Sequence, residues 1–443
     1  MKARSKPVLV NGRSYAWPAA PLVVICCDGS EPAYIEKARA AGLMPRIDRM
    51  IASGENRRGL SAMPSFTNPN NLSIATGAPP AVHGICGNYL IDPDTGHEEM
   101  MNDPKWLRAP TIFAGFQQAG AGVAVVTAKD KLRLLLGKGL VFDGTAVCFS
   151  SERADKATKS ENGVDDVCGA VGMNVPDVYS AELSEFVFAA GVWLLRTMRP
   201  DIMYLSTTDY IQHKHAPGTM AANRFYAMMD GYLGRLEDEG AIVVLVADHG
   251  MKDKHRPSGE PDVLYLQDAL DGALGKGRTR VILPITDPYV VHHGALGSFA
   301  TVYLDGADPA AVSEMIRAMP GIDIVLTREE ASARFELPPE RIGDLVVVSG
   351  GPNATKVIGT SRDRHDLSGL TEPLRSHGGL TEQEVPIIVN RRIDGIGGVL
   401  RNFDAFAIGC NHVVGSELSQ SRHPGESRDL SLSATGEMAI TRS

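Results

Sequence analysis

The chain has 443 residues, of which 44 are basic and 53 are acidic, so its formal net charge is -9. A negative chain has no general attraction for nucleic acid or for an anionic membrane surface, so we expect neither of these partners. The length allows a large hydrophobic core, and the scattered spacing of the six cysteines excludes a disulfide scaffold and a zinc knuckle. No apolar run approaches the roughly 18 residues of a membrane span, and the N-terminus lacks the apolar stretch of a secretory signal. We therefore expect a cytoplasmic protein.

Apolar runs of the kind that are buried in a parallel sheet alternate with helical patterns over the first 254 residues. This alternation is typical of βαβ crossovers, so we predict an α/β fold with a mostly parallel central sheet flanked by helices. The strands are predicted at 21–27, 122–128, 145–151, 201–209 and 241–248, and the helices at 45–53, 179–199 and 219–239.

The pattern changes after residue 254, which indicates an insertion. Between 255 and 370, strand-like runs and short helices no longer alternate regularly, so we predict an inserted α+β cap subdomain there. The core is then discontinuous and consists of residues 20–254 and 371–413, with its last strand at 385–390. Residues 414–443 are polar and rich in serine without a periodic apolar face, and we predict that they form a disordered tail.

Asp28, Asp209 and Asp248 each stand at the carboxyl end of a predicted strand. In an open parallel sheet, ligands bind beyond the carboxyl ends of the strands, so these side chains are expected at one edge. A single aspartate in such a position is more often a helix cap or a turn residue. Three clustered carboxylates repel one another in a low dielectric, and a bound cation removes that repulsion. The pattern therefore indicates a metal site.

Histidines near these aspartates support the same interpretation. His213 stands four residues after Asp209, which puts both side chains on one face if the segment is helical. His249 directly follows Asp248, and both can reach one metal only if the chain bends there, as the following glycine allows. His377 lies in the glycine-rich segment ahead of the last strand. Mixed Asp and His ligation is typical of Zn²⁺, with Mn²⁺ and Fe²⁺ as the other candidates.

Six short motifs follow one another along the chain: DGS at 28–30, MPSFTNPNN at 63–71, HGICGN at 83–88, STTDYIQHKHAPG at 206–218, VADHGM at 246–251 and RSHGG at 375–379. This ordered set resembles the alkaline phosphatase superfamily of two-metal phosphoryl-transfer enzymes, in its phosphodiesterase and phosphonoacetate hydrolase branch. One motif alone would be a weak signal, but together they cover nearly the whole catalytic part of the chain. The fold of the superfamily, a central sheet with flanking helices and an inserted cap, agrees with the organisation predicted above.

The resemblance implies two Zn²⁺ ions per subunit, both held by residues at the carboxyl edge of the sheet. The first ion is assigned to Asp209, His213 and His377. The second ion is assigned to Asp28, Thr67, Asp248 and His249.

Thr67 is also the nucleophile that the resemblance implies. On sequence alone, a threonine before Asn-Pro is more often a helix cap, and one residue can serve as both. A hydroxyl is a weak nucleophile at neutral pH, and metal coordination favours its alkoxide. Asn68 and Asn70, at the predicted start of a helix, offer donors for an anionic oxygen. The resemblance implies a double displacement in which a phosphothreonine forms and is then hydrolysed by water.

The residues around the metal site indicate the substrate. Lys129 and Lys131 follow the strand at 122–128, at the edge where a ligand binds, although loop lysines are more often surface charges. Two ammonium groups there suit a substrate with a second anionic group, such as a phosphonate that carries a carboxylate. The resemblance places Asn88 against the phosphoryl oxygens, and His215 is expected near the site. We therefore expect hydrolysis of the C–P bond of phosphonoacetate to acetate and phosphate, with the lysines stabilising the negative charge that develops.

Two alternatives remain open on the sequence. The same two-metal core serves nucleotide pyrophosphatases and phosphodiesterases, and much higher activity on a diester than on phosphonoacetate would favour that function. The other alternative is a non-catalytic metal-binding protein on an inactive phosphatase fold, which metal binding without turnover would support. A homodimer is expected only from the base rate of soluble oligomers.

Overall fold

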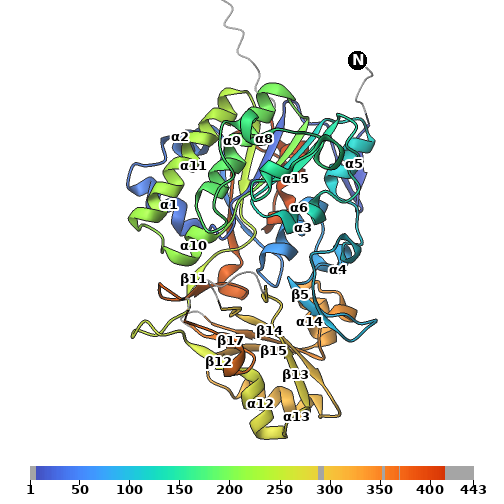
Figure 1. The fold of residues 1–443 in the computed structure, drawn as a ribbon, viewed down its shortest axis with the longest axis vertical. Helices are drawn as coiled ribbons and strands as arrows, with labels where there is room; N and C mark the ends of the chain where they lie inside the picture. Colours follow the sequence, from blue (N-terminus) through green and yellow to red (C-terminus); the bar gives the residue numbers. More distant parts are fainter. Residues whose placement is uncertain (1–5, 288–293, 352–354, 369, 415–443) are drawn as a thin grey trace, which may run out of the picture.

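An eight-stranded sheet runs through the larger part of the molecule. The structure, a computed structural model, describes residues 6–287, 294–351, 355–368 and 370–414. Figure 1 shows this sheet with its helices above a smaller body that contains a second sheet. The predicted tail from residue 415 onward lies outside the described residues.

The large sheet is mixed but mostly parallel. Every neighbouring pair of strands is parallel except the two pairs that involve the strand Glu384–Val389, which runs antiparallel to both neighbours. That strand was predicted as the last of the core, but a short strand at Leu400–Arg401 follows it. The prediction of a mostly parallel sheet is confirmed, and the reversed strand is the exception to it. The strand order is β20 (Leu400–Arg401), β4 (Glu55–Leu60), β19 (Glu384–Val389), β10 (Ile242–Val246), β3 (Leu22–Cys26), β9 (Ile202–Ser206), β7 (Val123–Thr127) and β8 (Ala146–Ser150).

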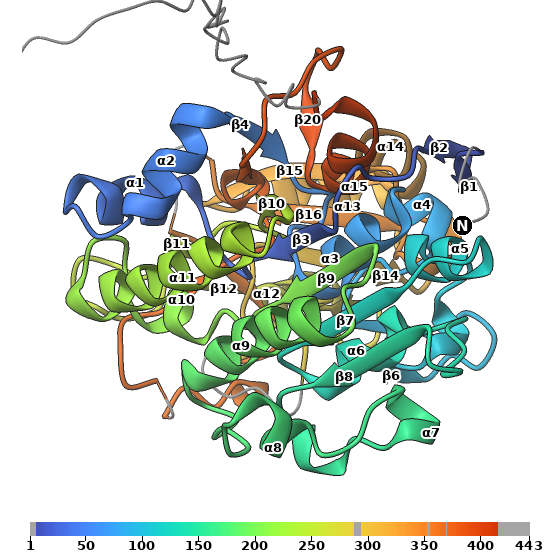
Figure 2. The same ribbon diagram turned by 90° about the horizontal axis from the view of Figure 1, so that it is seen from above.

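Helices cover both faces of this sheet, because its central strands are apolar on both sides. In β3, Leu22 and Val24 point into one hydrophobic cluster, whereas Val23 and Ile25 point into the other, and all four are fully buried. Figure 2 shows the two helical layers from above. One layer contains α1 (Pro32–Ala40), α2 (Pro45–Ser53), α9 (Glu182–Thr197) and α11 (Met220–Asp238), and the other contains α3 (Thr67–Thr76), α5 (Ile112–Gln118), α6 (Asp130–Leu136) and α15 (Ala405–Ala407).

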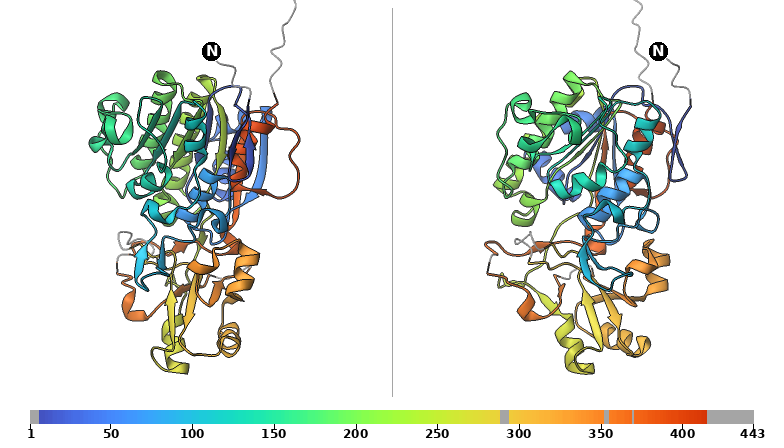
Figure 3. Two further views of the ribbon diagram at one scale, coloured as in Figure 1. Left: turned by 90° about the vertical axis from the view of Figure 1, so that its right-hand side faces the viewer. Right: turned by 45° about the vertical axis from the view of Figure 1, so that its right-hand side comes forward.

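The smaller body is built on a second, antiparallel sheet of four strands. Its strands and helices all fall within the predicted insertion at 255–370, although the exact domain boundaries remain predictions. Figure 3 shows the two bodies from two further sides. The strand order is β13 (Thr279–Ile282), β14 (Phe299–Leu304), β16 (Leu345–Ser349) and β15 (Ile322–Thr327), and the helices are α12 (Leu266–Leu274), α13 (Pro309–Arg317) and α14 (Arg328–Phe335).

The chain passes between the two bodies twice, at neighbouring points. It leaves the core through β11 (Lys252–Asp253) and returns through β18 (Arg375–Ser376). These two short strands pair with each other in an antiparallel ladder. Both passages therefore lie next to the segments that carry His249 and His377.

Two features expected from composition can be checked directly. All six cysteines are free, and Cys26 and Cys27 are fully buried within the core. Among the described residues, no helix is both long enough and apolar enough to cross a membrane.

Candidate active site

Three neighbouring strands bring the predicted aspartates to one edge of the large sheet. β3 lies between β10 and β9, and the three strands run in the same direction. Asp28, Asp209 and Asp248 follow these strands, so they meet beyond the carboxyl ends. Asp28 and Asp248 are buried. Asp248 Oδ1 accepts hydrogen bonds from the backbone nitrogens of Gly29 at 3.1 Å and His249 at 2.9 Å.

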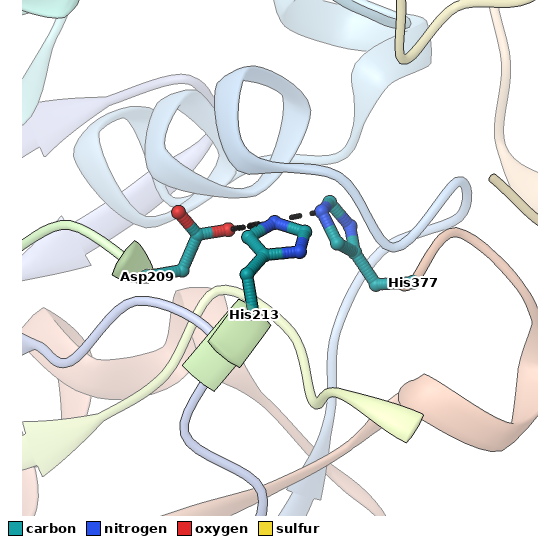
Figure 4. Close-up of side chains that lie close together, drawn as sticks. All are labelled: Asp209, His213 and His377. Atoms are coloured by element: carbon teal, nitrogen blue, oxygen red, sulfur yellow. Dashed lines mark ion pairs between the residues drawn. The ribbon is translucent and has the colours of Figure 1, made fainter. Parts of the chain in front are cut away.

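The first predicted ligand group is assembled around Asp209. This residue caps the short helix α10 (Tyr210–Lys214), so His213 lies on the same face one turn later. Nε2 of His213 is 2.9 Å from Asp209 Oδ2, and Nε2 of His377 is 3.8 Å from the same oxygen. Figure 4 shows the three side chains converging from α10 and from the loop after β18. One ligand atom from each of the three lies within 4.8 Å of the others, which is a geometry suited to one metal ion.

The second predicted group lies around the ring of His249. Its Nε2 atom is 3.4 Å from Asp28 Oδ1, 3.3 Å from Thr67 Oγ1 and 3.7 Å from Asp248 Oδ2. Asp28, Asp209 and His249 also offer one ligand atom each within 4.8 Å of one another. Asp209 is therefore shared between the two groups, whereas the sequence analysis assigned it to the first alone.

The hydrogen bonds of the three histidines show that their rings suit a metal. Nδ1 of His213 faces the carbonyl oxygen of Arg375 at 2.8 Å, and Nδ1 of His377 faces that of Ser65 at 2.9 Å. Nδ1 of His249 faces the carbonyl oxygen of Gly250 at 2.9 Å. Because a carbonyl oxygen only accepts, each Nδ1 donates a proton to it, which leaves Nε2 as the ring atom that can coordinate a metal. All three Nε2 atoms face the carboxylates, which is the arrangement that a divalent cation requires.

The charges at this edge of the large sheet also favour a bound cation. Burial, together with the nearby carboxylates of Asp209 and Asp248, raises the pKa of Asp28 well above its usual range. Asp28 Oδ1 is buried and accepts no hydrogen bond from the described part of the chain. Burial and the neighbouring imidazoles of His249 and His213 lower the pKa of His377 well below its usual value. The clustered carboxylates thus repel one another, and a metal ion offsets this repulsion.

Thr67 is the first residue of α3, the helix that points its N-terminus at this cluster. Asn68 lines the cavity beside it, as the sequence analysis expected for a donor to an anionic oxygen. Asn70 does not take that role, because its side chain is fully buried and bonded to the loop that precedes the helix. Its amide nitrogen donates to the carbonyl oxygens of Ala62, Pro64 and Phe66, at 3.1, 3.1 and 3.0 Å. Asn70 therefore holds the loop that leads into Thr67 and is not available to a ligand.

A cavity joins the metal-binding edge to the two lysines. Lys129 directly precedes α6 and Lys131 is the second residue of that helix, so both stand beyond the carboxyl end of β7. His215 is not among the residues that line the cavity. The lining residues are Asp28, Thr67, Asn68, Asn88, Thr127, Lys129, Lys131, Leu132, Thr207, Thr208, Asp209, His213, Ile285, Asp287 and His377.

The lysines sit in a partly desolvated environment. Burial lowers the pKa of Lys129, and burial together with the Lys129 ammonium lowers the pKa of Lys131 to about 8. Lys131 also forms an ion pair with Asp287 of the smaller body, and this contact favours the charged lysine. Lys129 Nζ donates to the carbonyl oxygen of Val178 at 3.2 Å. The sequence analysis missed Asp287, because nothing in the sequence connects it with a lysine more than 150 positions earlier.

Comparison with known proteins agrees with this geometry. Residues 22–378 match the family described as Type I phosphodiesterase / nucleotide pyrophosphatase. The phosphonoacetate hydrolase of Sinorhizobium meliloti 1021 is 63% identical, with a TM-score of 0.88 over 91% of this chain and 98% of its own. Crystal structures of that enzyme contain phosphonoformate or phosphonoacetate.

A more distant relative shares the fold. Murine ectonucleotide pyrophosphatase / phosphodiesterase 5 is 16% identical, with a TM-score of 0.59 over 88% of this chain and 94% of its own. At this identity the likeness concerns the fold alone, a central mixed sheet flanked by helices.

Proposed function

The chain belongs to the Type I phosphodiesterase / nucleotide pyrophosphatase family, and on that premise we propose that it hydrolyses the C–P bond of phosphonoacetate to acetate and phosphate. One observation carries the proposal. A single cavity is lined by four members of the cluster (Asp28, Asp209, His213 and His377) and by Lys129 and Lys131, so it suits a substrate with a phosphonate at one end and a carboxylate at the other. The 63% identity to a phosphonoacetate hydrolase supports the same substrate.

We propose that the cluster holds two Zn²⁺ ions. The first would be bound by Asp209, His213 and His377. When bound, zinc supplies a Lewis acid that favours a deprotonated hydroxyl and offsets charge on phosphoryl oxygens. The second would be bound by Asp28, Thr67, Asp248 and His249.

Thr67 acts as the nucleophile in this proposal. Its Oγ1 attacks phosphorus, the C–P bond breaks, and the electron pair of that bond passes into the carboxymethyl group. There it delocalises into the carboxylate as an enediolate, which takes up a proton from water to become acetate, while the hydroxyl proton of Thr67 is released to the solvent. Water then hydrolyses the phosphothreonine and releases phosphate. The position of Thr67 at the N-terminus of α3 leaves backbone N–H groups free to face an anionic oxygen.

Lys129 and Lys131 stabilise the charge that develops on the leaving group. An ammonium group beside the enediolate lowers the barrier because it is already in place and partly desolvated. Asn88 lines the same cavity, and its backbone nitrogen is fixed by a 2.7 Å bond to the carbonyl oxygen of Pro284. We assign its side chain to the phosphoryl oxygens. His215, outside the lining of the cavity, is left without a role in substrate binding.

The deciding experiment is to measure phosphate and acetate released from phosphonoacetate by the zinc-loaded enzyme, with Thr67→Ala as the matched variant. We expect equal amounts of the two products from the wild type and none above background from the variant. Bis-p-nitrophenyl phosphate is assayed in parallel. Strong turnover of that diester without acetate release would assign the chain to the phosphodiesterase alternative. Zinc binding without turnover of either substrate would support the non-catalytic alternative. The cytoplasmic location and the homodimer stay predictions.

A further inference from the structure

Asn71 occupies an unusual position between the proposed nucleophile and a proposed metal ligand. It lies on α3 one turn after Thr67, and its side chain is fully buried. Its amide nitrogen donates to the carbonyl oxygen of Thr67 and to Asp248 Oδ2, each at 3.0 Å. Its amide oxygen accepts from the hydroxyls of Tyr204 and Ser206 on β9, each at 2.7 Å. All four contacts of one amide are therefore short and buried.

The orientation of this amide follows from the chemistry of its partners. The carbonyl of Thr67 and the carboxylate of Asp248 can only accept hydrogen bonds, so the NH₂ group must face them. A flipped amide would set its oxygen against these acceptors. The hydroxyls of Tyr204 and Ser206 are then left to donate to the amide oxygen.

We propose that Asn71 is a positioning residue that holds the first turn of α3 and the carboxylate of Asp248 at a fixed separation. The attacking hydroxyl and the metal-ligating carboxylate come from different elements, α3 and the end of β10, and the Asn71 amide bonds to both. The Asn402 amide also links these elements, but it contacts Asn70 and the carbonyl oxygens of Ala247 and Asp248 and not the Asp248 carboxylate. The inference rests on the proposed function for the role of Thr67. Asn71 itself contacts neither the proposed metal ions nor the substrate, and it acts through the residues that do.

Asn71→Asp tests the inference with almost no change in shape. The new carboxylate faces Asp248 and the Thr67 carbonyl without a donor, so the two elements repel instead of being joined. We expect zinc affinity, measured by competition with a chromophoric chelator, to fall by about 10- to 100-fold. We expect kcat to fall by a similar factor while KM stays nearly constant, because Lys129 and Lys131 are untouched. If Asn71 only stabilised the fold, its replacement would not lower kcat while leaving KM unchanged.

Asn390→Asp is the matched control. Asn390 is equally buried and bonds to the same sheet, through the carbonyl oxygen of Ala241 at 3.0 Å and the nitrogen of Val243 at 2.9 Å. These contacts lie at the start of β10, at the end of the strand opposite to the site. We expect this variant to lose stability and to keep its zinc affinity.

A second variant keeps the inference testable if Asn71→Asp does not fold. Tyr204→Phe combined with Ser206→Ala leaves the Asn71 amide in place but removes both donors to its oxygen, so zinc affinity and kcat should fall by a smaller factor. Zinc affinity and turnover of an aryl phosphodiester are measured without phosphonoacetate, so a wrong substrate assignment does not affect the result. Wild-type zinc affinity in a folded Asn71→Asp enzyme, or an equal loss in Asn390→Asp, would overturn the inference.

Discussion

At the scale of single residues, the charge of Lys131 depends on the groups around its ammonium. Burial and the neighbouring Lys129 ammonium lower its pKa to about 8, and the carboxylate of Asp287 favours the charged form. Glu152 and Asp209 also lie close enough to favour the ammonium. A lysine carries its charge below its pKa and loses it as the pH rises. The proposed stabilisation of the leaving group is therefore lost on the alkaline side.

This environment predicts a pH profile. We expect kcat/KM for phosphonoacetate to fall as the pH rises above about 8. In Lys131→Arg the fall should be absent, because a guanidinium keeps its charge throughout this pH range. Bis-p-nitrophenyl phosphate, whose leaving group needs no ammonium, is the control substrate, and both enzymes should share one profile on it. If Lys131→Arg and the wild type lose phosphonoacetate activity at the same pH, Lys131 does not control the alkaline side.

The residue scale also shows what a sequence can predict about a site. Asp28, Asp209 and Asp248 were predicted as site residues because each follows a predicted strand. The structure brings them together because β10, β3 and β9 are neighbours. Asn71 and Asp287 do not stand at the end of a predicted strand, so the sequence did not indicate them. Their roles depend on which way one amide faces and on a contact between distant segments, and neither has a signature in spacing or composition.

At the scale of elements, a buried ion pair fixes the two passages between core and insertion. Lys254 follows β11 and Glu382 belongs to a short turn after His377, and their side chains, Nζ to Oε1, are 3.0 Å apart with 0% exposure for both. Glu382 Oε2 also accepts from the backbone nitrogen of Gly379 at 2.9 Å. The pair thus ties the outgoing strand to the loop that carries a proposed metal ligand.

Breaking this pair should destabilise the fold strongly. Lys254→Met leaves the Glu382 carboxylate buried without its partner, and we expect a loss of about 3–5 kcal/mol in the free energy of unfolding. Equilibrium urea denaturation measures it. The double variant Lys254→Met/Glu382→Leu should recover much of the loss, because it removes both charges. Lys105→Ala, in the exposed pair with Glu99, should change stability by less than about 1 kcal/mol. An equally small change for Lys254→Met would contradict the prediction.

The elements also differ in how far the sequence predicted them. β3, β7, β8 and β10 begin and end within two residues of their predicted bounds, and β9 ends three residues earlier than predicted. All five are continuous apolar runs, because both of their faces are buried. β4 was missed, since its sequence ENRRGL is mostly exposed and charged. The antiparallel direction of β19 was missed for another reason. A buried apolar run looks the same whichever way the strand points.

At the scale of the whole molecule, the site spans the boundary between the two bodies. The core supplies the metal cluster and the lysines, and the smaller body supplies Ile285 and Asp287 to the same cavity. Ligands that bind the folded state alone increase its stability by mass action. Zinc bound across several strand ends should therefore stabilise the entire core and not only the loops that touch it.

Metal removal tests this expectation. Free zinc at about 1,000 times its Kd contributes about 4 kcal/mol to the stability of the folded state. We expect a chelator to lower Tm by several degrees and added zinc to restore it. Asp209→Asn, which alters the carboxylate shared by both ligand groups, should show a much smaller shift. Equal Tm values with and without chelator in the wild type would show that the cluster does not hold a tightly bound metal.

The order of the ligands along the chain has a consequence for biosynthesis. Asp28 is made near the beginning, whereas His377 follows the whole insertion, and the two lie side by side only in the finished fold. A nascent chain on the ribosome can bury its first strands early, but it lacks the complete ligand set until His377 has emerged. A metal ion that needs all the proposed ligands is therefore bound only after His377 has emerged, and a ribosome that stalls within the insertion releases a polypeptide without the complete proposed site.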